Sequence, residues 1–356
     1  MRRRLSYFIA AMLCLGLAAC NGPQKSGPGA KDSGEQVPSE IPSSDEPAGE
    51  APSGAEAPSS IFPTVTVPSV FGDDEQLRTD YVLEHYWDSF LGREGATTPN
   101  AILGISDGSV EQALANYIQI LSNIKATSTP DDLKPLKKAQ KSVQKFFDKI
   151  EAKQQADTSA HTYLRLTEMV SRYLYDPNSP LRDEDLYLPF VEAMSKSSFT
   201  REDMRNAYNY ELKMCKTNPY GSKVPDIRYK DVNGHKGTLY AVKADYTMLF
   251  FSNPGCESCK GIIKDVMSRG NIEWLISDKK LSIVNIYIDE EVSKWREYSP
   301  NYPSCWINGY DYTFSLRDSG AFDIRAIPSL YLLDSSKRVI MKDAPTEKVL
   351  AFIDTL

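Results

Sequence analysis

Apolar positions recur with a helical period through the middle of the chain. Within residues 110–121 they fall three or four positions apart, which places them on one face of a helix. The predicted helices cover residues 81–90, 110–121, 136–150, 163–174, 183–196 and 200–214. Six helices with short connections and no strand pattern between residues 74 and 214 indicate an all-α bundle.

Polar residues at the start of two of these segments have the spacing of helix caps. Ser109 with Gln112, and Thr200 with Asp203, each place a hydroxyl three positions before a second polar side chain. In such a pair the hydroxyl accepts from a free backbone N–H at the helix start. We therefore expect helices to begin close to residues 109 and 200.

The pattern changes after residue 215 from helical stripes to short apolar runs, which predict strands. The runs cover residues 227–232, 238–242, 247–251, 281–288, 329–333 and 338–341. Asn233-Gly234 lies between the first two, and this dipeptide is typical of a β-hairpin turn. Helical faces at 259–267 and 346–356 alternate with the strands. The predicted fold class is α+β multidomain, with an all-α helical bundle followed by an α/β domain.

The first twenty residues have the order of a bacterial secretory signal. Three arginines precede an apolar run over residues 6–19, which is too short to form a stable membrane span. Two alanines then precede Cys20. This ending resembles the bacterial lipobox, which implies cleavage before Cys20 and a diacylglyceryl group on its sulfur. An ordinary signal peptide followed by a chance cysteine is the alternative.

Composition separates a tether from the rest of the chain. Residues 21–68 are rich in Pro, Ser, Gly, Ala and Glu and have almost no apolar periodicity, so they predict a disordered segment. The expected divisions are a signal peptide at 1–19, a lipidated cysteine and tether at 20–70, a helical domain at 71–215 and a second domain at 216–356.

Charge and hydropathy restrict the partners of the predicted protein. The net charge is −7, which argues against a nucleic-acid partner because such a surface needs to be basic. No later run reaches eighteen apolar residues, so the chain is expected to be anchored by lipid rather than to span the membrane. The predicted location is the cell envelope, on the periplasmic side of the membrane or at the outer membrane.

One cysteine pair stands where chemistry is expected. Cys256-Glu257-Ser258-Cys259 follows a buried strand and opens a helix. Free backbone N–H groups and the positive end of the helix dipole favour a thiolate there, and the thiolate is the nucleophile. We expect Cys256 to attack a disulfide and Cys259 to resolve the mixed disulfide. The carboxylate of Glu257 disfavours thiolate formation, so a reducing couple is expected.

Three other interpretations of the Cys256–Cys259 spacing remain open. The pair could be half of a zinc site, although no second cysteine pair or histidine pair lies nearby. It could also form a purely structural disulfide in an exported protein. Finally, it could be an active site that has lost its activity. The position between a strand and a helix favours the chemical role.

A second motif lies at 322–334, where Pro328 begins an apolar strand. Phe-Phe-Ser-Asn-Pro-Gly-Cys-Glu-Ser-Cys followed at a distance by Ile-Pro-Ser-Leu-Tyr-Leu-Leu-Asp resembles the thioredoxin fold. The resemblance implies that Pro328 is a cis-proline beside the cysteine pair. It also implies that Ile327 offers backbone groups to an extended substrate. A trans proline at the start of an edge strand is the alternative.

The resemblance extends from residue 74 to residue 356. The segment 290–321 and the leading hairpin resemble the TlpA-like branch of the thioredoxin superfamily. The whole arrangement, including the sequence His-Tyr-Trp-Asp at 85–88, resembles Bacteroidetes lipoproteins with a helical domain of unknown function before a thioredoxin-like domain. Two positions depart from the pattern. Phe250 replaces the buried acid of thioredoxins, and Ile262 replaces a glutamate common in TlpA-like reductases.

Several other residues have competing interpretations. Cys305 could be a third redox thiol, a disulfide partner of Cys215 or, as we expect, a plain buried cysteine. Trp295 and Trp306 could line a substrate groove, but the core of the 290–321 segment is the simpler expectation. The aromatic and charged residues at 85–88 are expected to pack between helices rather than bind a ligand. The lysines between 134 and 149 predict a solvated helix face.

The sequence therefore predicts a disulfide reductase of the cell envelope. Its partners would be protein disulfides, a membrane thiol electron donor and the membrane itself through the N-terminal lipid. No metal, flavin or nucleotide cofactor is implied. The alternative is a non-enzymatic envelope lipoprotein, in which the helical domain binds a ligand or partner and the thioredoxin-like part is a scaffold.

Overall fold

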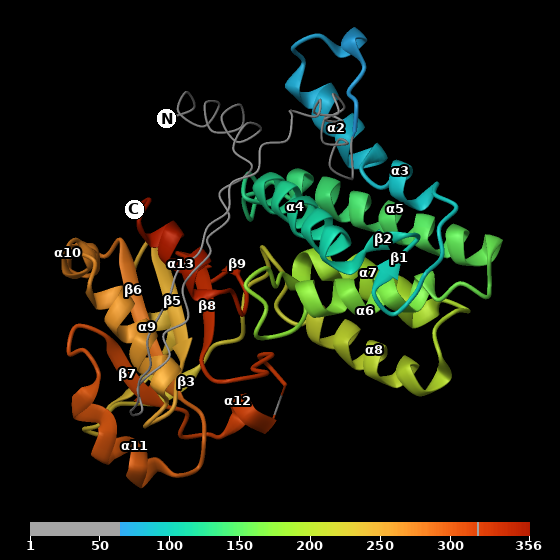
Figure 1. Ribbon diagram of the computed structural model, residues 1–356. Coiled ribbons are helices and arrows are strands. Elements are labelled where there is room, and N and C mark those ends of the chain that lie inside the picture. Colours follow the sequence, from blue (N-terminus) through green and yellow to red (C-terminus); the bar gives the residue numbers. More distant parts are fainter. Residues whose placement is uncertain (1–64, 319) are drawn as a thin grey trace, which may run out of the picture. The chain divides into compact units, whose positions relative to one another are not determined.

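The computed structural model describes residues 65–318 and 320–356 (Figure 1). The predicted signal peptide, the lipidation site at Cys20 and nearly all of the predicted tether lie outside these residues. The described residues belong to one compact unit. None of their helices is both long and apolar enough to cross a membrane.

Helices fill the first part of the described chain (Figure 1). The bounds are α2 (Glu75–His85), α3 (Asp88–Leu91), α4 (Asp107–Lys125), α5 (Lys134–Ala156), α6 (Thr162–Leu174), α7 (Glu184–Lys196) and α8 (Glu202–Cys215). The apolar stripes meet in one core, in which the rings of Phe147 and Phe190 lie edge to face at 5.1 Å. The predicted fold class is confirmed, because these helices are followed by a mixed sheet with further helices. We call residues 75–215 the helical region.

Local details of the helical region differ from the prediction. A single helix over 81–90 is wrong, because the chain breaks between α2 and α3 and turns Trp87 inward. The Trp87 ring stacks on Phe146 at 4.3 Å, and this contact accounts for the break. A two-stranded hairpin, β1 (Ala101–Ile102) with β2 (Ile105–Ser106), precedes α4 and was not predicted.

Both predicted caps are wrong, by three residues at α4 and by one residue at α8. Helix α4 begins earlier, because Ser106 accepts the cap hydrogen bond from the N–H of Ser109. At α8 the hydroxyl of Thr200 donates instead to the carbonyl of Met194, 2.6 Å away, and Arg201 takes the cap position. Serine and threonine hydroxyls bond to whichever local backbone group they reach first, so the spacing alone did not identify the cap.

Helix α7 contains a proline, and a side chain from α5 replaces the backbone hydrogen bond that this proline removes. Pro189 has no N–H, so the carbonyl four positions earlier, that of Asp185, receives no helix hydrogen bond. The side-chain amide of Gln140 in α5 donates to that carbonyl at 2.8 Å. This contact helps to fix α7, whose first residue contributes to the site described below.

A seven-stranded mixed sheet fills the second part of the chain, in the order β4-β3-β7-β6-β5-β8-β9. The strands are β3 (Arg228–Lys230), β4 (Lys236–Thr238), β5 (Tyr246–Phe251), β6 (Leu281–Tyr287), β7 (Ile307–Tyr310), β8 (Ser329–Asp334) and β9 (Val339–Met341). The helices are α9 (Glu257–Met267), α10 (Ile272–Ser277), α11 (Val292–Tyr298), α12 (Ser315–Asp318) and α13 (Thr346–Ile353). Short 3-10 helices occur at Ser69–Phe71, Leu239–Ala241 and Ser299–Asn301.

Alternate residues of the central strands face two separate cores. From β5, Met248 and Phe250 face the core that includes α9, α10 and α13. Leu249 and Phe251 face a second core, which the sheet shares with residues 224–242 and Phe322. Because β5 pairs with β6 on one side and β8 on the other, it lies inside the sheet, and its carboxyl end leads directly into the cysteine pair.

Strand β7 was not predicted from the sequence. It pairs in parallel with β6 and antiparallel with β3, so it joins the leading hairpin to the centre of the sheet. A Cβ at Gly309 would lie 2.7 Å from the ring of Tyr229, so this position requires glycine. A strand of four residues that includes Asn308 and Gly309 has no apolar run, and its position depends on packing with its neighbours.

Candidate active site

Cys256 lies at the start of α9, immediately beyond the carboxyl end of β5. It occupies the cap position, and its sulfur accepts a hydrogen bond from the N–H of Cys259 at 3.1 Å. The two cysteines form a disulfide with their Cα atoms 5.2 Å apart. Cys259 is only 2% exposed, whereas Cys256 is half-buried. An incoming sulfur can therefore reach Cys256 far more easily than Cys259.

Glu257 does not act as an isolated negative charge beside Cys256. Its carboxylate accepts from the ammonium of Lys260 at 2.6 Å, and both side chains are exposed. The ammonium of Lys260 offsets the negative charge that was expected to oppose a thiolate at Cys256. Glu257 therefore gives little support for a reducing couple.

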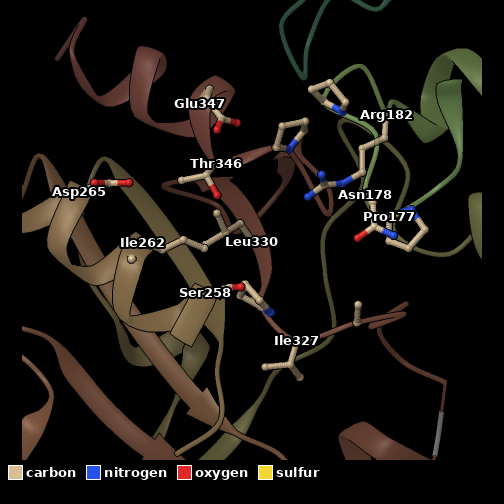
Figure 2. A pocket seen from close by; sticks show the side chains of 15 residues that line it. Pro177, Asn178, Arg182, Ser258, Ile262, Asp265, Ile327, Leu330, Thr346 and Glu347 are labelled. Atoms are coloured by element: carbon tan, nitrogen blue, oxygen red, sulfur yellow. The ribbon is translucent and has the colours of Figure 1, made fainter. Parts of the chain in front are cut away.

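The Ile327–Pro328 peptide bond is cis, as the resemblance implied. Both residues line a groove of about 480 Å³ together with Ser258 and Ile262 from the first turns of α9 (Figure 2). Cys256, Cys259 and Ile327 also contact the same apolar core. The structure thus brings the two predicted motifs together, and the catalytic and docking roles of these residues remain predictions.

The chain just before Pro328 has backbone groups available for pairing. Ala326 is exposed and Ile327 is half-buried. Among the described residues, no hydrogen bond engages the N–H or the carbonyl of either residue. The regular ladder with β5 begins only at Ser329. An extended chain could therefore pair with this short edge, as in strand addition.

Asp343 fixes the segment that carries Ile327 and Pro328. One oxygen of its buried carboxylate accepts from the guanidinium of Arg325 at 2.8 Å. The other accepts from the hydroxyl of Ser329, also at 2.8 Å. These contacts lie on the two sides of the cis peptide bond. Such support reduces the freedom of a docking edge before a partner arrives.

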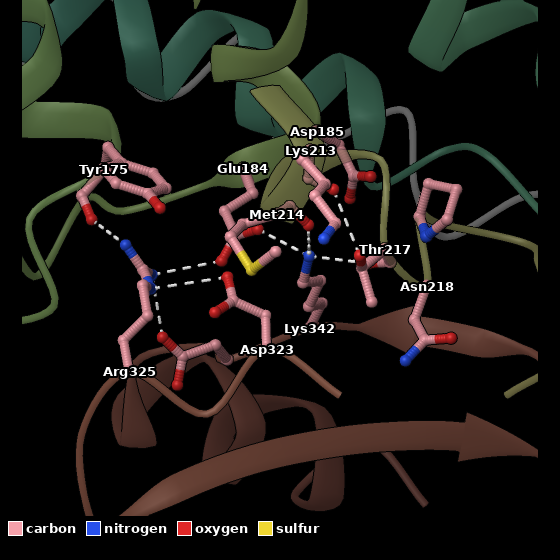
Figure 3. Close-up of polar contacts among 12 residues, drawn as sticks. Tyr175, Glu184, Asp185, Lys213, Met214, Thr217, Asn218, Asp323, Arg325 and Lys342 are labelled. Atoms are coloured by element: carbon pink, nitrogen blue, oxygen red, sulfur yellow. Dashed lines mark hydrogen bonds and ion pairs between the residues drawn. The ribbon is translucent and has the colours of Figure 1, made fainter. Parts of the chain in front are cut away.

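The helical region also contacts the segment that carries Ile327 and Pro328, through Arg325 (Figure 3). The guanidinium of Arg325 lies 4.2 Å from the ring centre of Tyr175 and donates to the carbonyl of that residue. It also lies 3.1 Å from the carboxylate of Glu184, the first residue of α7. Helices distant in sequence therefore help to position the chain beside the cysteine pair.

Lys342 completes this buried charged cluster. Its ammonium lies 2.6 Å from Glu184 and donates to the carbonyls of Met214 and Thr217. Both carboxylate oxygens of Glu184 are buried and neither accepts a well-directed hydrogen bond. We call Glu184, Arg325, Lys342 and Asp343 the charged seam, since they join the helical region to the segments around β8 and β9.

Burial determines how groups in and beside the charged seam titrate. Loss of hydration raises the pKa of Glu184 to about 7, because it outweighs the attraction of Lys342 and Arg325. Burial likewise raises the pKa of Asp323, despite the same two cations. The pKa of the Cys215 thiol is raised by burial and by the nearby charge of Glu184, so this thiol is not poised for nucleophilic chemistry.

The expectation that Cys305 is buried is wrong, and one alternative for it is excluded. Cys305 is exposed rather than buried, and it does not pair with Cys215, since both are free thiols. Cys305 ends the turn before Trp306, whose large ring takes the buried position against Phe250. Cys215 is buried at the end of α8.

Three tryptophans are buried as expected, whereas His85 and Asp88 lie at the surface rather than in the packing between helices. Trp295 and Trp306 are both buried, and neither lines the groove beside α9. Trp87 belongs to the core of the helical region, while His85 and Asp88 form a surface hydrogen bond.

The lysine-rich face of α5 forms ion pairs with another helix, which the sequence did not suggest. Lys138 and Lys145 form ion pairs with Asp80 and Glu84 of α2, rather than facing only solvent. Within residues 65–318 and 320–356, no group of three His, Cys, Asp or Glu side chains is placed to hold a metal ion.

Comparison with known families identifies the first part of the chain. Residues 36–218 match a family model described as a domain of unknown function, DUF5106, which covers just over half of the chain. This chain belongs to the DUF5106 family. No curated protein matches this DUF5106 protein at a significant level.

Solved structures extend the comparison to the second part. A thioredoxin-like protein from Bacteroides caccae ATCC 43185 is 33% identical, with a TM-score of 0.67, and the match covers 82% of this chain and 97% of that one. The C-terminal domain of an uncharacterised protein from Bacteroides fragilis NCTC 9343 is 38% identical over 39% of this chain and 99% of its own, with a TM-score of 0.37. The DUF5106 protein therefore has a thioredoxin-like relative along most of its length.

Proposed function

We propose that this DUF5106 protein is a thiol–disulfide oxidoreductase that reduces disulfides in client proteins. The observation that carries the proposal is the pairing of a half-buried Cys256 at a helix start with a buried Cys259, beside the groove that Ile327 and Pro328 line. This arrangement gives one sulfur for attack, one for release and a backbone edge for the client.

The reaction would proceed by two exchanges. In the reduced protein the Cys256 thiolate attacks a client disulfide, so that a mixed S–S bond forms and the client S–S bond breaks. The Cys259 thiolate then attacks the Cys256 sulfur, which closes the enzyme disulfide and releases the second client sulfur. The client gains two electrons and two protons, and the enzyme thiols lose them. A dithiol donor protein, itself oxidised to a disulfide, restores the reduced pair.

The proposal also includes an envelope location. The signal-like first twenty residues and Cys20 support export and attachment by lipid, and the composition of residues 21–68 supports a tether. In an oxidising compartment, client disulfides would be available as substrates. The electron donor would then be a membrane dithiol protein.

A trapping experiment tests the activity. Removal of the resolving sulfur by Cys259→Ser should leave clients attached to Cys256, visible as high-mass bands on a non-reducing gel. The double variant Cys256→Ser/Cys259→Ser should trap nothing. Cys305→Ser is the matched control, because it removes an exposed thiol outside the pair. It should leave insulin reduction by the otherwise intact protein unchanged.

The opposite result would favour the scaffold alternative. If Cys259→Ser traps no client, and insulin reduction by the intact protein equals the background rate, the disulfide is structural and the proposal fails.

A further inference from the structure

The groove beside the cysteine pair has a wall that the thioredoxin-like part does not supply. One side consists of residues from α9 and the Ile327–Pro328 segment. The other side includes the loop between α6 and α7 (Figure 2). The lining residues of this loop are Pro177, Asn178, Pro180 and Arg182. The helical region therefore faces the space that a client would occupy next to its disulfide.

The α6–α7 loop is held in one conformation before any client arrives. Asp176 accepts from the backbone N–H of Asn178 at 2.7 Å, which forms a tight polar turn. The buried Ser179 donates to the carbonyl of Tyr173 at 2.6 Å. Two prolines further limit the loop. A preformed wall loses little conformational freedom when a client binds, so it can discriminate between clients.

Arg182 connects the α6–α7 loop to the segment before α13 by hydrogen bonds. Its guanidinium donates to the carbonyls of Asp343 and Ala344, at 2.6 and 3.0 Å. The next residues, Pro345, Thr346 and Glu347, line the groove themselves. The positive charge of Arg182 is therefore engaged with the protein.

Two acids in the groove have free carboxylates. Asp265 of α9 and Glu347 of α13 line it, and both are exposed. Within the described part of the chain, neither carboxylate has an ion-pair or hydrogen-bond partner; only the backbone carbonyl of Asp265 is engaged, by Ser268 and Arg269. The same groove therefore presents two carboxylates, one of them attracted by Arg182, and the unpaired backbone edge at Ile327, so acids outnumber the one cation that lines it.

We infer that the α6–α7 loop is the second wall of the client groove, and that the groove selects extended polypeptide segments with lysine or arginine beside the disulfide. The inference rests on the proposed function. The unpaired edge at Ala326 and Ile327 accommodates an extended backbone, Asn178 and Pro177 limit its width, and Asp265 and Glu347 set the preferred charge.

Two peptides of equal length test the preferred charge. Each is unstructured and carries one internal disulfide, and they differ only in two lysines or two glutamates beside the second cysteine. Each kcat/KM is divided by that of the same protein on hydroxyethyl disulfide, a small neutral substrate. For the full chain, the lysine peptide should be favoured about fivefold over the glutamate peptide at low salt.

Two sets of variants test the charge preference and the α6–α7 wall independently. In the double variant Asp265→Asn/Glu347→Gln, the normalised kcat/KM of the lysine peptide should be about equal to that of the glutamate peptide. Asn178→Trp should lower the normalised kcat/KM of both peptides about tenfold, mainly through KM, because the larger ring narrows the groove. Asn116→Trp on α4 is the matched control, since Asn116 is also exposed and lies outside the groove. It should leave both values unchanged.

The outcomes distinguish the inference from the proposed function. Equal rates on the two peptides in the unaltered protein overturn the charge selection. If Asn178→Trp lowers the normalised kcat/KM no more than Asn116→Trp does, the α6–α7 loop is not a wall of the client groove. If the unaltered protein fails to reduce even hydroxyethyl disulfide, the proposed function is wrong and this inference falls with it.

Discussion

The core of the helical region and the charged seam are both buried, but they are built from opposite kinds of side chain. The core is apolar, with Phe147, Phe190 and Leu186 almost fully enclosed. The seam buries two cations and two carboxylates. Apolar burial stabilises the fold whatever its detailed geometry, whereas buried charges stabilise it only when every partner is in place.

This difference indicates separate tasks for the two regions. The core supplies stability and tolerates rearrangement among apolar side chains of similar volume. The seam contributes little net stability, but it fixes the position of the segment around Ile327. Changes to the core should therefore affect unfolding, and changes to the seam should affect both unfolding and the geometry of the site.

The largest effect is expected in the apolar core. Leu186→Ala in α7 should lower the free energy of unfolding by about 3–4 kcal/mol, because it leaves a cavity in a fully enclosed position. Leu164→Ala in α6 is the matched control, since Leu164 is 37% exposed, and it should cost about 1 kcal/mol or less. Urea unfolding measures both. Similar losses in the two variants would contradict the assigned core.

Breaking the seam should have the next largest effect. Arg325→Met leaves Glu184 and Asp343 buried without their shared cation, and should cost about 3 kcal/mol. Hydrogen exchange at residues 324–330 should also become faster relative to exchange in the rest of the sheet, whereas a core variant should accelerate exchange without this local difference. Arg317→Met removes an exposed arginine paired with Glu290 and should change neither quantity. Unchanged exchange in Arg325→Met would refute the positioning role of the seam.

A comparable effect concerns the pH dependence of stability, and its sign is defined. The pKa of Glu184 is raised from 4.5 to about 7, so between these values the folded protein binds more protons than the unfolded chain. Its contribution to stability is therefore complete below pH 4.5 and is lost as the pH rises through 7. Glu184→Gln should remove this part of the pH dependence, on the order of 3 kcal/mol. Unfolding measured at several pH values gives the comparison with the unaltered protein.

The smallest effect is expected at the surface of the helical region. Lys138→Met removes the ion pair with Asp80 between α5 and α2, and should cost about 0.5 kcal/mol or less because both side chains are partly solvated. The difference from the unaltered protein should vanish at 0.5 M NaCl, where such pairs are screened. A loss that persists at high salt would show that the lysine stem, rather than its charge, supports α2.

Periodicity predicted the apolar core because that core consists of regular stripes. The stripe over residues 110–121 is buried on α4 as expected, and the runs around β5, β6 and β8 form the centre of the sheet. The positions of the two candidate site motifs could also be predicted. The cysteine pair and Ile327–Pro328 stand at the ends of recognisable strands, and the structure places both beside one groove.

The rest depends on contacts between residues distant in sequence. Nothing local distinguishes Glu184 and Arg325 from surface charges, and only the packing of α7 against the sheet region buries them together. The α6–α7 wall was missed for the same reason. Strand β7 was missed because a strand with Asn308 and Gly309 has no apolar signal of its own.

The two oxygens of Asp343 set a distance within the chain. One holds Arg325 and the other Ser329, so the flanks of Ile327 cannot shift independently of each other. The length of the Asp343 side chain therefore fixes the position of residues 325–329. A glutamate at position 343 would keep the charge, but its side chain is longer by one methylene. The backbone at Ile327 would then lie at a different position relative to Cys256 and Cys259.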